Sequence, residues 1–320
     1  MMRYVFFILI LSVASFSEET DSSKIKEAME IGGLVTLDIY GPVKEMDHPS
    51  FEIGSVYLGA NMTLSPAVTA SVVIAAEGNM EALWIDQAIG VLAPEGSSWS
   101  LSAGQQTLKH GLLTTRLICD PLILDSVELI NPALTADYTK GVFTYGAAFT
   151  AIPTLSPDTA LINNDRLDWT AVLALDYNNE ESILQAARLS SLITDRKQDI
   201  DLAVTATLKS FTLDLEAYSV LNSNRPELVS GSFAGLSWQA TEKLAIAGRY
   251  DMLSPDRFKD ADNKVCFGAK FDIRDGIFCA VEFERTWFNS GGNENEINLQ
   301  LGLENTIKLP GFHRETLTNN

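Results

Sequence analysis

The sequence predicts an all-β fold: a transmembrane antiparallel up-and-down β-barrel of about sixteen strands, preceded by a cleaved signal peptide. Three observations support this prediction. Segments of roughly ten residues alternate between apolar and polar side chains. The connections between these segments alternate between short and long, and the most apolar continuous run lies at the start of the chain.

The N-terminal segment has the pattern of an export signal. Arg3 precedes an apolar run from Tyr4 to Ala14, and the following Ser-Phe-Ser provides small residues for cleavage. This run is well short of the roughly 20 residues that a spanning helix needs. We therefore predict a signal peptide over 1-17 and a short polar leader over 18-29.

The alternation of apolar and polar residues over 200-221 predicts a complete β-hairpin with one apolar and one polar face. Apolar side chains occupy every second position on both sides of Lys209-Ser210. If these two residues form the turn, Leu208 pairs with Phe211 and every apolar residue meets an apolar partner, which a one-residue slip would prevent. The polar face of this hairpin carries Asp201, Asp214 and Glu216.

The same alternation recurs along the chain and places the barrel at 30-304, with a C-terminal tail over 305-320. A second tight hairpin is predicted with Lys140-Gly141 as its turn. The segment 183-193 fits a strand, and it also fits one or two turns of helix. The predicted strands cover 30-39, 51-64, 66-77, 82-93, 99-107, 132-139, 142-152, 167-177, 183-193, 199-208, 211-221, 228-239, 243-252, 264-273, 277-288 and 296-304.

The lengths of the connections separate a barrel from a soluble β-sandwich. A sandwich gives the same local alternation, with its polar face in solvent. Here the links after even strands are tight, whereas most links after odd strands are longer and richer in Pro, Gly, Asn and Asp. This pattern, over about sixteen strands in one meander, is typical of a bacterial outer-membrane barrel with periplasmic short turns.

Composition excludes several classes of function. The net charge of -19 argues against nucleic-acid binding, which needs a basic surface. The three cysteines are too few for a disulfide framework, and the three histidines lack the spacing of a metal site. No catalytic or cofactor motif follows a predicted strand. We predict no cofactor, no dedicated metal site and no enzymatic activity.

The longest connection, 108-131, does not alternate and is rich in leucine. We expect it to bend into the barrel, because its apolar side chains need burial that a solvent-facing loop would deny them. The other possibility is an external lid with solvated charges. Folding inward would place four polar residues at a constriction of the pore: Lys109, His110, Arg116 and Asp120.

This loop and the strand before it resemble the LbtU family of siderophore porins. The matching positions are Trp84, Asp86, Gln87, Ala88, Gly104, Gln106, Gly111, Asp120-Pro121-Leu122 and Glu128, together with the first strand from Glu30 to Leu34. Lys109-His110 replace the Pro-aromatic pair expected before the glycine, and the chain does not end on an aromatic residue. The resemblance implies passage of a ferric siderophore or a similar solute.

The polar faces of the predicted strands would line a water-filled lumen. Rings of charged residues there can set selectivity, or they can simply keep the lumen wet. The residues expected to line it are Asp86, Asp201, Asp214, Glu216, Arg249, Asp251, Glu282 and Glu284.

The expected function is that of a bacterial outer-membrane porin for passive uptake of a ferric siderophore or similar small solute. Its expected partners are outer-membrane lipid, the outer-membrane assembly machinery and that solute. The alternatives are a general anion or small-solute porin, and a barrel enzyme or secreted β-sandwich that binds polysaccharide.

Overall fold

The computed structural model describes residues 29–42, 50–77, 82–111, 117, 122, 130–155, 162–194, 197–223, 230–254 and 261–309. These residues form sixteen strands in one sheet. The strands are β1 (Met29–Pro42), β2 (Ser50–Ser65), β3 (Val68–Glu77), β4 (Ala82–Leu92), β5 (Trp99–Thr107), β6 (Ile130–Lys140), β7 (Phe143–Leu155), β8 (Ile162–Asn178), β9 (Leu184–Thr194), β10 (Lys197–Leu208), β11 (Phe211–Ser223), β12 (Ser230–Gln239), β13 (Leu244–Ser254), β14 (Asp262–Arg274), β15 (Ile277–Trp287) and β16 (Asn293–Leu309).

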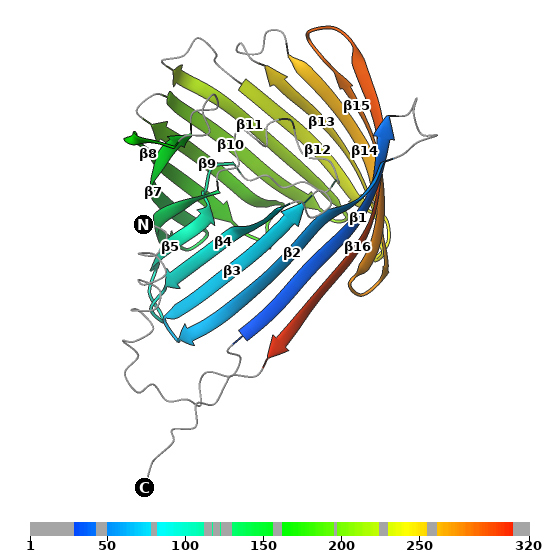
Figure 1. Ribbon diagram of the computed structural model, residues 1–320. Helices are drawn as coiled ribbons and strands as arrows, with labels where there is room; N and C mark the ends of the chain where they lie inside the picture. The colour runs from blue at the N-terminus through cyan, green and yellow to red at the C-terminus, as the bar shows by residue number, and fades with distance from the viewer. Residues whose placement is uncertain are drawn as a thin grey trace.

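The sheet closes on itself. Each strand pairs antiparallel with its neighbours in sequence, and β1 pairs with β16 from Met29 opposite Leu309 to Pro42 opposite Glu296. Figure 1 shows this closure, with the blue β1 beside the red β16. Closure leaves no exposed strand edge. The predicted antiparallel barrel is confirmed, and β16 continues to Leu309, beyond the predicted end of the barrel at Glu304. Within the described part of the chain, no helix is long and apolar enough to cross a membrane.

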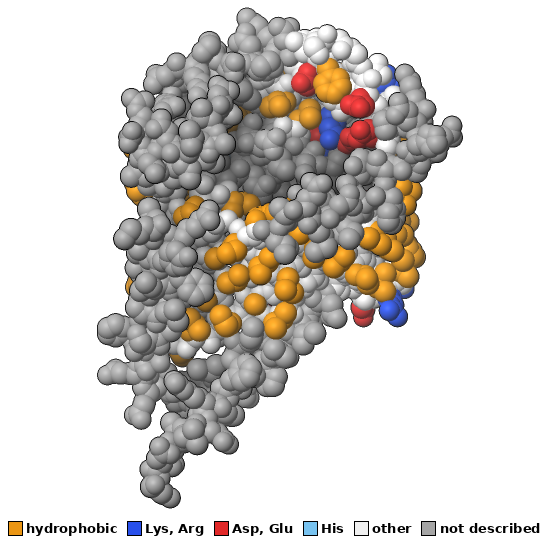
Figure 2. Space-filling model, in the orientation of Figure 1, with side chains coloured by type: hydrophobic (Ala, Val, Ile, Leu, Met, Phe, Trp, Pro, Cys, Tyr) orange, Lys and Arg blue, Asp and Glu red, His pale blue; other side chains and the backbone are white. Residues whose placement is uncertain are grey.

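The two faces of the wall differ in polarity. On β11 the side chains of Leu213 and Leu215 are about 40% exposed, whereas those of Asp214 and Glu216 are at most 4% exposed. Figure 2 shows hydrophobic side chains spread over the outer wall, with acidic and basic side chains gathered at the open end of the barrel. Proteins that are surrounded by water rarely expose an apolar surface of this extent. The outer wall therefore faces lipid, and the polar face lines the lumen.

The hairpin of β10 and β11 has the predicted register. Leu208 lies opposite Phe211 and Thr205 opposite Asp214, as the alternation required. Lys209 in the turn has a φ of 56°, the left-handed conformation that a two-residue hairpin turn demands and that a lysine rarely adopts. The pairing of the two strands therefore imposes the turn conformation on an unfavourable residue.

The second predicted hairpin is wrong by one residue. Its turn is Gly141-Val142, so that Lys140 lies opposite Phe143 and Tyr138 opposite Tyr145. Gly141 takes the first turn position with a φ of 60°, which glycine adopts at no steric cost. The doubtful segment 183-193 is the strand β9, and no part of it is helical.

Aromatic side chains gather on the outer face near the short turns. Phe143 packs against Tyr177 with ring centroids 5.5 Å apart, and Phe211 stacks on Trp238 at 6.0 Å. Each pair joins neighbouring strands beside a turn. Aromatic side chains are enriched at the interface between lipid and water in outer-membrane barrels. These pairs therefore mark one boundary of the lipid-facing band.

Candidate functional site

The inner wall carries the predicted acidic and basic residues. Seven of the eight side chains expected in the lumen are at most 9% exposed: Asp201, Asp214, Glu216, Arg249, Asp251, Glu282 and Glu284. The eighth, Asp86, is half-buried. It lies at a bulge of β4, because Ile85 pairs with Ile74 and Gln87 pairs with Val73, which leaves Asp86 without an opposite residue on β3. The strand pattern thus places these polar groups on the face away from lipid.

Strand register arranges these residues in two rows around the wall from β9 to β16. One row runs across Asp214, Gly235, Arg249, Cys266, Glu284 and Glu296. The other runs across Arg188, Ala203, Glu216, Phe233, Asp251 and Lys264. Each row therefore carries charges of both signs, and Glu284 lies opposite Glu296 at the end of the first row.

Ion pairs connect the two rows on β13, β14 and β15. The Nε of Arg249 lies 2.8 Å from a carboxylate oxygen of Asp251, and the Nζ of Lys264 lies 2.9 Å from Glu284. Such buried pairs add little net stability, because desolvation offsets their attraction. Their effect is to fix the position of each charge on the wall.

Strand β5 separates from β4 just after Gly104, before the loop begins. Pairing of β4 with β5 ends at Ala88 opposite Gln105, although β5 stays paired with β6 as far as Thr107. The Nε2 of Gln105 instead donates to the carbonyl oxygens of Ile85 at 2.5 Å and Asp86 at 3.3 Å. The side chain thus replaces backbone partners that β5 no longer supplies.

Gly104 makes this departure possible. Its φ of 138° lies outside the range that residues with a side chain normally adopt, and a Cβ atom there would overlap the carbonyl oxygen of Ala88. The neighbouring Gln106 is buried and donates to the carbonyl oxygen of Ala133 at 3.0 Å. Gly104 and Gln106 therefore have a structural role at the start of the loop.

The first residues of the loop are fixed to the wall formed by β6 to β9. The Nζ of Lys109 lies 2.7 Å from Asp137 and 3.6 Å from Asp176. Asp176 also accepts from the Nε of Arg188 at 2.5 Å. Gly146 on β7 leaves room for this group, since a Cβ atom there would lie 2.8 Å from Asp137.

His110 is buried at the centre of a second set of contacts. Its Nδ1 lies 3.1 Å from the Oγ of Ser190, and its ring meets Tyr218 edge-on at 5.9 Å. The hydroxyl of Tyr218 donates to Asp199 at 3.1 Å. A serine beside a histidine can form a nucleophile and base, but both side chains are only 1% exposed. A substrate has no access to them, so the pair anchors the loop.

The described residues from Gly111 onward contact two different parts of the wall. The carbonyl oxygen of Gly111 accepts from Arg188 at 2.6 Å, on β9. Further along, a methyl group of Leu117 lies 3.1 Å from the Cβ position of Gly268 on β14. The backbone of Leu122 donates to Asp251 on β13. These contacts lie on inner faces of strands that are far apart around the barrel, so the described part of the loop lies inside the lumen.

Two of the four predicted constriction residues lie on the wall. Lys109 and His110 are held there by the contacts above, whereas Arg116 and Asp120 lie outside the described residues. Sequence reasoning missed the partners Asp137, Arg188, Ser190 and Tyr218. Their inward positions in the strand pattern were the available signal, but three of them lie in the shifted hairpin or in the segment 183-193, which also fitted a helix.

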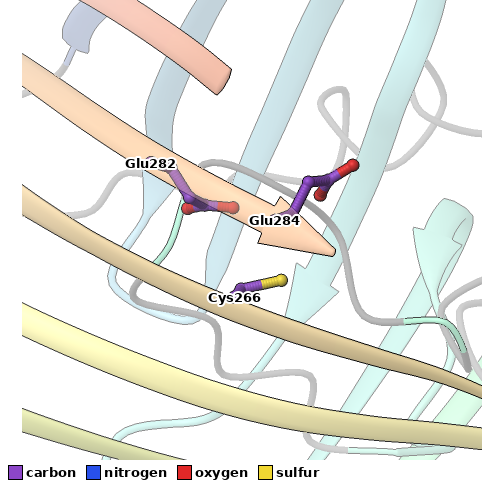
Figure 3. A group of neighbouring side chains, drawn as sticks. All are labelled: Cys266, Glu282 and Glu284. Atoms are coloured by element: carbon purple, nitrogen blue, oxygen red, sulfur yellow. The ribbon is translucent and has the colours of Figure 1, made fainter. Parts of the chain in front are cut away.

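One group on the inner wall has the composition of a metal site. Cys266, Glu282 and Glu284 are buried, with potential ligand atoms within 4.8 Å of one another (Figure 3). However, Lys264 lies 2.9 Å from Glu284, and an Nη of Arg249 lies 3.8 Å from the thiol sulfur. Two cationic side chains already compensate this acidic group, so the arrangement does not require a metal.

Comparison with known proteins shows the fold. No protein-family model matches the chain, and no curated protein matches its sequence. The structure is similar to the outer membrane channel DcaP of Acinetobacter baumannii, with a TM-score of 0.67, 12% identity, and coverage of 90% of this chain and 100% of that one.

Two further solved structures agree with this result. Salmonella typhi OmpF, in complex with daunomycin, gives a TM-score of 0.66 at 8% identity over 88% of this chain and 98% of that one. An anion-selective porin from Comamonas acidovorans gives a TM-score of 0.62 at 10% identity, over 88% of this chain and 100% of that one. Together with the lipid-facing outer wall, these similarities mean that the chain is a sixteen-stranded barrel of the bacterial outer membrane with the fold of the porins.

Proposed function

We propose that this protein is a porin through which small hydrophilic solutes diffuse passively, and that the loop 108-131 narrows its lumen. The observation that carries the proposal is the path of the loop. It starts on β5, binds β6 to β9 through Lys109 and His110, and reaches β13 and β14 at Leu122 and Leu117. A segment that crosses a lumen restricts the size of the solutes that pass.

Lys109 and His110 fix the start of the constriction, and Arg116 and Asp120 complete it. The buried contacts of His110 hold the start of the loop against β9 and β11. Fixed charges at such a point select solutes by their charge as well as by their size.

The wall around the constriction favours cations over anions. The described cations Lys109, Arg188, Arg249 and Lys264 each lie within 2.9 Å of a carboxylate. Acidic side chains on β10 and β11 also line this wall, among them Asp199, Asp214 and Glu216. A pore lined by surplus carboxylates concentrates cations.

A ferric siderophore is a narrower proposal for the cargo. It is supported by the resemblance of the loop, whose motif residues Gly104 and Gln106 direct the chain away from β4. The acidic wall disfavours a strongly anionic complex, so a neutral or cationic ferric siderophore fits this lumen better. A general small-solute porin remains the alternative.

Single-channel recording tests the constriction. Replacement of 112-121 by a short Gly-Ser linker should raise the conductance by roughly twofold or more, because the loop then no longer narrows the lumen. The matched control is a similar replacement of 289-291, in the connection between β15 and β16, which should leave the conductance unchanged. Equal conductance in both variants would contradict the proposed position of the loop.

Blockade experiments test the cargo. Ferric complexes of neutral, cationic and anionic siderophores, added to one side, should interrupt the current only if they enter the constriction. Interruption by none of them, with normal ion conductance, would remove the siderophore proposal and leave the general porin.

A further inference from the structure

Arg285 on β15 is a charged residue on the lipid-facing side of the wall. Glu282 and Glu284 on the same strand are buried on the lumen side, whereas Phe283 and Trp287 are exposed on the outer face. Because side chains alternate along a strand, Arg285 shares the outer face with these two aromatic residues. An arginine on the lipid side of a barrel is costly at the bilayer centre and nearly neutral close to the interface. Its position along the strand therefore matters.

Arg285 lies where the apolar band of the outer face ends. Two residues before it, Phe283 lies between Phe267 on β14 and Ile297 on β16, so this row is entirely apolar. Two residues after it, Trp287 lies between asparagines on both neighbouring strands. Tryptophan is enriched at the membrane interface. This end of β15 belongs to the side of the barrel with the longer connections, which are extracellular in outer-membrane barrels. Arg285 therefore lies at the level of the lipid headgroups of the outer leaflet.

Among the described residues, the guanidinium group of Arg285 has an aromatic partner and no carboxylate. Its Cζ lies 4.9 Å from the centre of the Trp287 ring, a cation–π contact, and its Nε is buried without a hydrogen-bond acceptor. The inward cations Arg249 and Lys264, by contrast, lie 2.8 and 2.9 Å from carboxylate oxygens. Arg285 thus presents its positive charge at the membrane interface, and a guanidinium group binds phosphate oxygens with two parallel hydrogen bonds.

An apolar hollow lies further along the same face, toward the short turns. It measures about 380 Å³ and is lined by β1, β14, β15 and β16, which lie side by side where the barrel closes (Figure 1). Cys279 lies between Phe271 and Leu301, and Ala269 lies opposite Val281. The small side chains of Cys279 and Ala269 thus leave a depression among larger neighbours. Apolar walls on the lipid side of the barrel suit an acyl chain.

We propose that Arg285 and this hollow form a binding site for a phosphorylated lipid of the outer leaflet, with its phosphate at Arg285 and an acyl chain in the hollow. Val281, which lines the hollow, is four residues from Arg285 on the same face, about 13 Å along the strand. The charge and the hollow therefore follow each other from the interface into the hydrocarbon, as the headgroup and chain of a lipid do. The unpaired charge favours a phosphate over the apolar outer wall of a second copy of this chain. The site lies outside the lumen and does not depend on the passage of solutes.

Native mass spectrometry of the full-length protein, released from micelles with added lipid, measures how much lipid stays bound. The wild type should retain diphosphoryl lipid A in preference to phosphatidylcholine, whose headgroup carries no net charge. Arg285→Gln should weaken the retention of lipid A by roughly tenfold or more, because a charge-assisted contact is lost. Lys140→Gln is the matched control. It removes a cation opposite the outward Phe143 at the short turns and should behave as the wild type.

A second pair of variants tests the hollow. Ala269→Phe fills it and should weaken the retention of lipid A although Arg285 is intact. Ala136→Phe adds the same ring to the exposed outer face of β6 and should leave retention unchanged. Heat-modifiable migration on a gel verifies that each variant is folded.

The outcomes separate this site from the proposed pore. Arg285→Gln should conduct as the wild type does, and a wild type that forms no channel would contradict the proposed function while leaving the lipid measurement valid. Equal retention of lipid A by the wild type and Arg285→Gln, or equal retention of lipid A and phosphatidylcholine by the wild type, would overturn the lipid site. A changed oligomeric state of Ala269→Phe with unchanged retention would assign the hollow to a contact between copies, and would overturn it too.

Discussion

Gly104 is the residue on which the path of the inner loop depends most directly. A Cβ atom at this position would overlap the carbonyl oxygen of Ala88 and lie 2.9 Å from its carbonyl carbon. The φ of 138° also disfavours any side chain, at a cost of about 1–3 kcal/mol. Relief of the clash must separate β5 from β4 and disturb the two hydrogen bonds of Gln105, each worth about 1 kcal/mol. Gly104→Ala should therefore destabilise the barrel by roughly 3–5 kcal/mol.

Gly90→Ala is a matched control on the same pair of strands. Gly90 lies opposite Ala103, and its nearest neighbour at the Cβ position is 3.9 Å away. Denaturant unfolding in micelles, followed by tryptophan fluorescence, should show a large loss of stability for Gly104→Ala only. The altered start of the loop should also make the single-channel current noisier. Equal stability of the two variants would refute the role assigned to Gly104.

Three further predictions test the anchor, the turn and the membrane-facing wall. Asp176→Asn should destabilise the barrel by about 3–5 kcal/mol, because it leaves Arg188 without its buried partner, whereas Asp137→Asn at a more exposed pair should cost about 1 kcal/mol or less; equal effects would contradict the anchor. Lys209→Gly should stabilise the protein by about 0.4–1 kcal/mol in the same unfolding assay, since glycine tolerates the positive φ of the turn, and a lower midpoint would argue against that turn. Leu202→Lys, in the middle of β10, should cost about 2–4 kcal/mol and Leu208→Lys, beside the turn, no more than about 1 kcal/mol, because lipid penalises charge most at the bilayer centre; the reverse order would contradict the assigned lipid face.

The hairpin of β10 and β11 shows what local sequence can determine. Lipid on one side and water on the other require alternation along every strand, and a one-residue slip would reverse both faces. The strand positions and the inward acids, such as Asp214 and Glu216, could therefore be predicted. The turn at Gly141 was misplaced because two registers satisfied the same short pattern, and only the backbone conformation of the glycine distinguished them.

The inner loop depended on tertiary structure. Its leucine content predicted burial, but the partners of Lys109 and His110 lie on strands up to about a hundred residues away, where no periodic pattern relates them to the loop. By itself the sequence determined which residues face lipid and which face the lumen, because that choice repeats at every second residue. Tertiary structure alone decided which of the inward residues meet, because closure of the barrel brings distant strands around one lumen.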